Sequence, residues 1–104
     1  MTVRTAERRR NSRLPAAFPT VIRDRRGKLL AKGRTANISE NGVCIMIRRA
    51  AGVAIHDTVT IAMTVPADPI AGTRRLVNYR CRVVRRQEMG NVVGLGLTFI
   101  EKLP

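Results

Sequence analysis

The sequence predicts an all-β protein, a six-stranded antiparallel β-barrel preceded by a flexible basic N-terminal arm. Its 104 residues provide one hydrophobic core and therefore one ordinary domain. Apolar residues make up 44% of the composition and aromatic residues only 3%, so Val, Ile, Leu and Ala must fill that core. These residues occur in short runs that alternate with polar residues and end at turn residues, which is typical of strands rather than helices.

The first half of the barrel is predicted from three runs. FPTVIRD (18–24) alternates loosely and ends in RRGK, whose glycine suits a hairpin turn into LLAKGRTANIS (29–39). GVCIMIRR (42–49) begins at a glycine and is rich in β-branched residues. RRAAGVAIH (48–56) is the only segment for which a helical turn is expected.

The second half is predicted from three longer runs. VTIAMTVP (59–66) alternates between apolar and small residues and stops at the Pro and Gly loop PADPIAGT (66–73). RLVNYRCRVVRRQE (75–88) places Val, Tyr and Cys on one face and Asn and Arg on the other. NVVGLGLTFIE (91–101) closes the chain with a strand that carries two glycines, as barrel corners often do.

Residues 1–17 are rich in arginine and lack an apolar face, so they are predicted to form an arm that leads into the barrel at 18–104, both in a single domain. The arm has no signal-peptide core, and no apolar run approaches a membrane span, so a cytoplasmic location is expected. Cys44 and Cys81 lie in strand-like runs without zinc-ligand spacing, and we expect both to be buried, reduced thiols.

The inventory of catalytic residues is poor. The one histidine, His56, lies in a predicted turn, without the positioned partner that acid–base catalysis needs. The seven carboxylates are scattered, with no paired spacing for acid–base roles or for a metal cage. Gly94 and Gly96 lack the third glycine and the helix of a dinucleotide fingerprint. We therefore expect no enzyme, no catalytic residue, no metal and no cofactor.

The net charge of +13 comes from twenty Lys and Arg residues against seven acids, and most of the cations are arginines. Because guanidinium groups bind phosphate in a bidentate manner, we expect the partner to be an anion. Nucleic acid, an acidic lipid headgroup, an acidic protein surface and a nucleotide second messenger all remain open. A basic surface that merely keeps the chain soluble is also compatible with this composition.

Two segments are candidates for binding the anion. ERRRNSR (7–13) carries four arginines, of which Arg9 and Arg13 are spaced to close on one ligand from two sides. NISENG (37–42) places an amide, a hydroxyl and a glycine between two predicted strands, which suits a turn that presents donors on one surface. Each segment also has an ordinary interpretation, either a nonspecific basic arm or a turn that only connects strands.

Together, the two segments resemble the PilZ domain, the bacterial receptor for cyclic di-GMP. The resemblance rests on an arginine pair followed by a further arginine, and on an Asn-x-Ser-x-x-Gly segment. It extends through GVCIMI, CRVVRR and GLGLTFIE and so covers residues 7–101. The family's six-stranded barrel agrees with the strands predicted above. The matching residues are Arg8, Arg9, Arg13, Asn37, Ser39 and Gly42.

For the arm, the resemblance implies that Arg9 and Arg13 grip the phosphates and guanines of the ligand. Arg8 stands just ahead of them, at a position that in the family influences whether one ligand or a stacked pair is bound. Four negative charges in one pocket are tolerable only where several guanidinium groups converge, and four arginines lie within six residues here. We therefore predict two cyclic di-GMP molecules per chain.

For the turn, the resemblance implies that Asn37 contacts a guanine and that Ser39 reaches the ligand. Gly42 is implied to shape the turn and to let the backbone come close. Asn41 stands where members of the family often have glycine, and asparagine tolerates the left-handed conformation that glycine would use.

The expected function is that of a stand-alone receptor or adaptor. Cyclic di-GMP would order the arm over the barrel and so present a changed surface to a downstream protein partner. The alternative is a small basic β-barrel that binds RNA or single-stranded DNA. Such proteins stack bases on aromatic platforms. This chain has only Phe18, Tyr79 and Phe99, at least two of which fall on predicted core faces, so nucleic acid is the less favoured partner.

Overall fold

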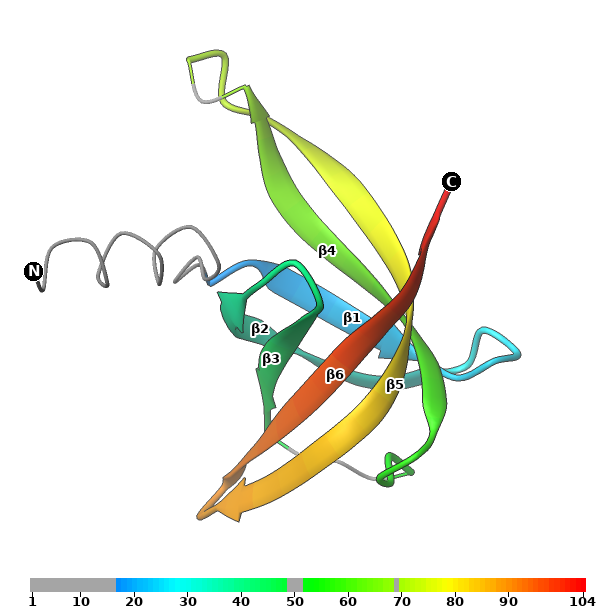
Figure 1. Ribbon diagram of the computed structural model, residues 1–104. Helices are drawn as coiled ribbons and strands as arrows, with labels where there is room; N and C mark the ends of the chain where they lie inside the picture. The colour runs from blue at the N-terminus through cyan, green and yellow to red at the C-terminus, as the bar shows by residue number, and fades with distance from the viewer. Residues whose placement is uncertain (1–16, 49–51, 69) are drawn as a thin grey trace, which may run out of the picture.

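The computed structural model describes residues 17–48, 52–68 and 70–104. These residues form six antiparallel strands that close into one barrel (Figure 1), which confirms the predicted fold class. Hydrogen-bonded neighbours follow the order β1-β2-β3-β6-β5-β4, and β1 pairs with β4 to close the barrel. The strands are β1 (Pro19–Arg23), β2 (Leu29–Ile38), β3 (Gly42–Ile47), β4 (Thr58–Asp68), β5 (Thr73–Met89) and β6 (Val92–Leu103).

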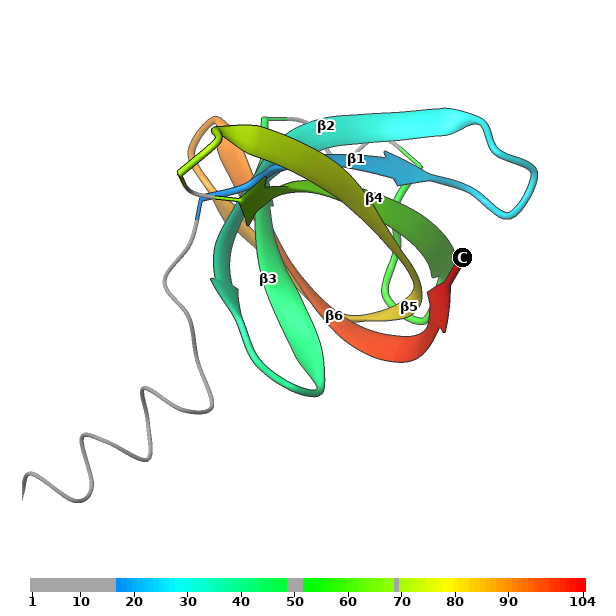
Figure 2. The same ribbon diagram turned by 90° about the horizontal axis from the view of Figure 1, so that it is seen from above.

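Alternate residues of the strands fill the barrel interior, around which the strands wrap in Figure 2. In β4 the side chains of Val59, Ile61 and Met63 are buried, whereas the residues between them are only partly buried. Successive residues of a strand point to opposite faces, so one buried face fixes the register. The core consists of Ile22, Val43, Ile45, Ile47, Val53, Val59, Ile61, Met63, Cys81, Val83, Val93, Leu95 and Leu97.

The two cysteines have different environments, and the expectation that both are buried is wrong for Cys44. Cys81 is fully buried in β5, and this burial raises the pKa of its thiol to about 12. Cys44 is only partly buried, because its neighbours Val43 and Ile45 take the inward positions of β3. Both thiols are free.

Tyr79 and Phe99 stack against each other, with ring centroids 4.1 Å apart and an angle of 20° between the ring planes. Both side chains are partly buried and pack against the core. The prediction that at least two of the three aromatic residues lie on core faces is therefore confirmed. These two rings consequently stabilise the barrel rather than form an exposed platform.

The turn between β1 and β2 is built around Asp24. Its carboxylate accepts hydrogen bonds from the backbone amides of Lys28 at 2.9 Å and Arg26 at 2.8 Å. These bonds, the one from Lys28 foremost, lower the pKa of the carboxyl group. Gly27 adopts a φ of 90°, a left-handed conformation that glycine reaches without strain. The predicted glycine hairpin is confirmed.

The segment before β4 forms turns, and the described residues of 48–56 do not form the expected helical turn. His56 has a left-handed φ of 78°, and its amide donates a hydrogen bond to the carbonyl oxygen of Val83 at 2.7 Å. The carboxylate of Asp57 accepts a hydrogen bond from the amide of Ala54 at 2.8 Å. The segment is thus held to the barrel by backbone hydrogen bonds, and His56 lies in a turn as predicted.

The strand directions bring distant segments to the same end of the barrel (Figure 1). Because all pairings are antiparallel, the start of β1, the β2–β3 turn and the β4–β5 turn share one end. The β1–β2 and β5–β6 turns and the start of β4 share the other. The described parts of the chain contain no helix, and hence none long and apolar enough to cross a membrane.

Candidate functional site

The turn between β2 and β3 lies beside an open hollow on the barrel surface. The hollow has a volume of about 410 Å³ and is formed by residues of β2, β3, β5 and β6 together with the turn. Asn37, Ser39 and Gly42 all line it, as the sequence predicts for a shared surface. A β-bulge in β2 between Thr35 and Asn37 changes the register just ahead of the turn, and bulges of this kind re-aim side chains.

Ser39 organises the turn. Its hydroxyl donates a hydrogen bond to the carbonyl oxygen of Gly42 and accepts one from the amide of Asn41, both at 3.4 Å. Its own amide donates to the same Gly42 carbonyl at 2.9 Å. The carbonyl of Asn41 accepts a hydrogen bond from the amide of Phe99 at 2.8 Å, which ties the turn to β6. Backbone hydrogen bonds therefore fix the turn on the barrel. Asn41 takes part in the turn without adopting a left-handed φ.

Gly42 is required by a contact between strands. A Cβ atom here would lie 2.1 Å from the carbonyl oxygen of Leu97 and 3.3 Å from Cα of Thr98. Gly42 is the first residue of β3, pairs with Thr98 of β6, and has no left-handed φ. Its place in the turn is thus explained by the close approach of β3 to β6. The close approach to a ligand that the resemblance implies stays a prediction.

Sequence patterns alone do not point to two further residues of the hollow, Arg85 and Gly96. Asn37, Cys44, Gly96 and Arg85 are successive cross-strand partners in β2, β3, β6 and β5. Strands lie about 4.8 Å apart, so this row is about 14 Å long. A Cβ atom on Gly96 would lie 3.2 Å from Cβ of Arg85. Arg85 therefore lies directly beside the backbone of Gly96, where no side chain fills the surface of the hollow.

Arg85 adds a cation to the hollow. It forms no ion pair with any residue in the described ranges, where the guanidinium groups that do so are those of Arg80 and Arg86. The chain register shifts at a bulge between Val83 and Arg85, which breaks the alternation of β5. The alternation of apolar and polar residues also fails at VVRR in the sequence, which agrees with the bulge but does not by itself point to the hollow.

The arginine motif in residues 8–13 lies outside the described residues, but the place where the arm joins the barrel is defined. The guanidinium group of Arg34 in β2 donates a hydrogen bond to the carbonyl of Ala17 at 3.3 Å. Arg34 is three residues before Asn37, so the chain enters the barrel at the end that carries the hollow. Arg13 is four residues before Ala17, and four extended residues span at most about 14 Å. Chain connectivity thus limits the distance between Arg13 and Ala17 to about 14 Å.

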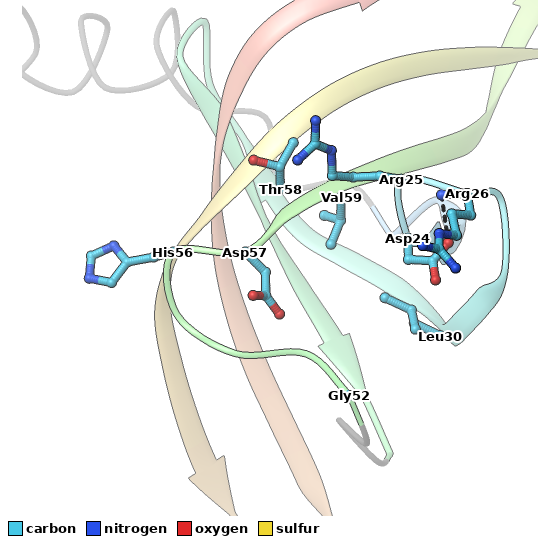
Figure 3. Close-up of a pocket in the computed structure, with 9 residues that line it drawn as sticks. All are labelled: Asp24, Arg25, Arg26, Leu30, Gly52, His56, Asp57, Thr58 and Val59. Atoms are coloured by element: carbon cyan, nitrogen blue, oxygen red, sulfur yellow. Dashed lines mark hydrogen bonds between the residues drawn. The ribbon is translucent and has the colours of Figure 1, made fainter.

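A second hollow lies at the opposite end of the barrel, between the β1–β2 turn and the segment before β4 (Figure 3). There His56 points away from the other labelled side chains, while the carboxylates of Asp24 and Asp57 accept backbone hydrogen bonds. Within the described ranges, no group of His, Cys, Asp and Glu gathers in a way that could hold a metal ion. Asp24 and Asp57 therefore shape the turns that border this hollow.

The barrel and the arginine segment match one known family together. Residues 7–104 match the PilZ domain, so the match includes both predicted motif segments. The chain belongs to the PilZ domain family. PilZ domains are cyclic di-GMP receptors and act as receptor or adaptor domains rather than as catalysts.

Solved structures share the fold of this PilZ domain. The inhibitor of motility from Bacillus subtilis (MotI/DgrA) superposes with a TM-score of 0.73 at 14% identity, over 88% of this chain and 42% of that protein. This chain therefore spans less than half of the Bacillus protein's length. The PilZ domain of CeSA from a cellulose-synthesizing bacterium superposes with a TM-score of 0.51 at 17% identity, over 86% and 81% of the two chains. No curated protein matches the sequence.

Proposed function

We propose that this PilZ domain binds cyclic di-GMP in the hollow beside the β2–β3 turn, with the arginine arm closing over the ligand. One observation carries the proposal. Asn37, Ser39 and Arg85 border a single open cavity beside the β2–β3 turn, and this turn lies at the end of the barrel where the arm joins at Ala17. Family membership supplies the chemical class of the ligand.

The side chains around the hollow suit a ligand that carries both phosphates and guanines. Asn37 offers an amide donor and an acceptor to a base edge. Arg85 offers a guanidinium group that binds phosphate in a bidentate manner or stacks on a purine. Gly96 has no side chain, so a flat ring can approach the strand backbone beside Arg85. The hollow thus combines charge recognition with room for a base.

The arm supplies the remaining cations in this proposal. Arg9 and Arg13 contact phosphates and guanines, and Arg8 extends the positive charge to a second ligand molecule. Ligand binding orders the arm over the barrel, and a downstream protein partner recognises the surface changed in this way. The domain acts in this way as a receptor or adaptor.

Calorimetric titration of the full chain with cyclic di-GMP tests the proposal, with GTP and a short single-stranded oligonucleotide as controls. We expect saturable binding of cyclic di-GMP alone. Arg9→Ala and Arg13→Ala should each abolish measurable binding, because each removes a charge-assisted contact that contributes about 1.5–3 kcal/mol. Arg25→Ala, at the opposite end of the barrel, is the matched control and should bind normally. Unchanged affinity in both arm variants would refute the proposal.

The same titration measures stoichiometry. We expect two ligand molecules per chain, and we expect Arg8→Ala to shift the count toward one while appreciable binding remains. Guanidinium groups offset the repulsion between two dianions, so removing one should act on the second ligand first. A ratio near one in the wild type, unaltered in Arg8→Ala, would show that Arg8 takes no part in binding.

Nucleic acid is the weaker candidate. Tyr79 and Phe99 stack on each other and pack against the core, so they are not placed to stack on the bases of a single strand. If the oligonucleotide bound more tightly than cyclic di-GMP, the nucleic-acid alternative would replace the proposal.

A further inference from the structure

The β4–β5 hairpin projects beyond the barrel (Figure 1). On one side, the pairing of β4 with β1 ends at Met63. On the other side, the pairing of β5 with β6 ends at Asn78. Thr64–Asp68 and the facing part of β5 therefore pair only with each other. The result is a two-stranded extension whose tip lies away from the hydrophobic core.

This extension exposes large apolar side chains, Ile70 at its tip and Leu76 near its base. Ile70 is 98% exposed and Leu76 is 63% exposed, the two highest values among large apolar residues of the described ranges. An isoleucine in this position gains nothing from burial within the chain. Its transfer into an apolar phase is favourable, so the tip is suited to contact with another body.

The turn at the tip is held by its own hydrogen bonds rather than by packing of Ile70. The carboxylate of Asp68 accepts hydrogen bonds from the amides of Ile70 at 2.9 Å and Ala71 at 3.3 Å. The amide of Gly72 donates to the carbonyl of Asp68 at 2.8 Å, and Gly72 has a left-handed φ of 72°. These hydrogen bonds hold the amides of Ile70, Ala71 and Gly72 to Asp68 while the side chain of Ile70 stays exposed.

Two cations follow the tip on the β5 side. Arg74 pairs with Pro66 and Arg75 with Val65, so the two arginines alternate between the two faces of the hairpin. Both are exposed, and neither forms an ion pair with a described residue. Asp68 is the only carboxylate among the described residues of the extension. It accepts hydrogen bonds from the amides of Ile70 and Ala71 rather than pairing with either arginine.

We propose that this tip docks onto an anionic lipid surface, with Ile70 in the acyl boundary and the two arginines at the level of the phosphates. Thr73 is the paired residue of β5 nearest the tip, and Arg74 and Arg75 lie about 3 and 7 Å farther along the strand. Apolar side chains of interfacial segments lie about 5–10 Å into the boundary between headgroups and acyl chains, and the two arginines follow the tip directly in the chain. A convex tip with cations on both faces suits a planar anionic surface, and the net charge of +13 adds to the attraction.

Vesicle sedimentation with the full chain tests this proposal. The probes are vesicles of phosphatidylcholine mixed with phosphatidylserine and vesicles of phosphatidylcholine alone, at physiological salt. We expect binding to the mixed vesicles only. Ile70→Ser should weaken it by about tenfold or more, whereas Ile55→Ser, at the opposite end of the barrel, should leave it unchanged. Equal binding to both vesicle types, or none to either, would overturn the proposal.

A charge-matched pair of variants separates docking from general attraction. The double substitution of Arg74 and Arg75 by Gln and that of Arg25 and Arg26 by Gln remove the same charge from opposite ends of the barrel. We expect only the first to weaken vesicle binding by about tenfold or more. Equal losses would show that the basic chain is attracted without orientation and would overturn the proposal.

Tryptophan fluorescence can report insertion at one chosen position. The chain contains no tryptophan, so a single introduced tryptophan is the only source of the signal. In Ile70→Trp, the emission should shift to shorter wavelength when mixed vesicles are added, whereas in Ile55→Trp it should not. Ile70 is almost fully exposed, so its replacement should not affect folding. Vesicle binding without a shift in Ile70→Trp would place another surface on the membrane and overturn the proposal.

Discussion

Replacing Gly42 by alanine should destabilise the barrel whether or not a ligand is present. The added Cβ would lie 2.1 Å from the carbonyl oxygen of Leu97 and 3.2 Å from its carbonyl carbon. Both atoms belong to the backbone of β6, which pairs with β3 from Gly42 to Ile47 and cannot rotate out of the way. To reach an ordinary contact distance, the start of β3 must move away from β6 by about 1 Å or more.

The cost of Gly42→Ala can be estimated from what this movement disturbs. Overpacking of a close-packed site costs about 1–3 kcal/mol. The amides of Phe99 and Ser39 donate hydrogen bonds to Asn41 and Gly42 at 2.8 and 2.9 Å, and weakening each costs about 0.5–1.5 kcal/mol. We therefore expect the free energy of unfolding to fall by about 2–6 kcal/mol, and the melting temperature by about 10 °C or more.

Urea unfolding followed by circular dichroism measures this loss, and Gly94→Ala in β6 is the matched control. A Cβ on Gly94 would meet the flexible ends of Met89 at 3.3 Å and Met46 at 3.5 Å, and the backbone oxygen of Gln87 at an ordinary 3.9 Å, so the change in unfolding free energy should stay below about 1 kcal/mol. The reasoning fails if Gly42→Ala unfolds at the wild-type urea concentration. If Gly42→Ala kept the wild-type stability but lost cyclic di-GMP binding, the glycine would be required for the ligand rather than for the pairing of β3 with β6.

Three further predictions concern the hollow and the thiols. Arg85→Ala should weaken cyclic di-GMP binding by about tenfold or more in calorimetry without changing the melting temperature, and unchanged affinity would remove Arg85 from the site. In the folded chain a disulfide reagent should modify Cys44 but not Cys81, whose thiol is buried with a pKa of about 12, and cyclic di-GMP should slow that modification. The raised pKa of Cys81 stabilises the fold fully below pH 9, the ordinary pKa, and this contribution is lost as the pH rises from 9 to about 12. Wild-type unfolding free energy should therefore fall relative to Cys81→Val by about 1.4 kcal/mol per pH unit in this range, and parallel pH curves for the two proteins would contradict this.

The fold was predictable where one face of a strand is buried and the other is polar. Ile61 and Met63 alternate with threonine and alanine, and this period-two pattern alone predicts β4. The pattern is weaker in β3, where Cys44 and Met46 are apolar although they take the outer positions, so the burial of Cys44 was predicted wrongly. The predicted loop 66–73 is shorter in the structure, because β4 and β5 continue to pair with each other beyond the barrel.

The site was predictable only where its residues are neighbours in the chain. Asn37, Ser39 and Gly42 lie within six consecutive residues, from the end of β2 to the start of β3, and their spacing alone brings them together. Arg85 and Gly96 reach the same hollow through the pairing of β3, β6 and β5 and through a bulge in β5. Such long-range register depends on closure of the whole barrel, which no local pattern encodes. The arginine motif lies outside the described residues and stays a prediction.

The two proposed surfaces share one end of the barrel, which has a consequence for signalling. Ala17, where the arm joins, lines a hollow of about 250 Å³ together with Arg34 and with Arg74 of the projecting hairpin. Each cyclic di-GMP molecule brings two negative charges to this end. If both proposals hold, bound ligand weakens the attraction between the hairpin and an anionic membrane, since Arg74 of the hairpin lines the same hollow as Ala17, where the arm joins. Thermodynamic reciprocity then requires anionic vesicles to weaken cyclic di-GMP binding by the same factor. Placing both surfaces at one end would therefore make this chain a receptor that its ligand releases from the membrane.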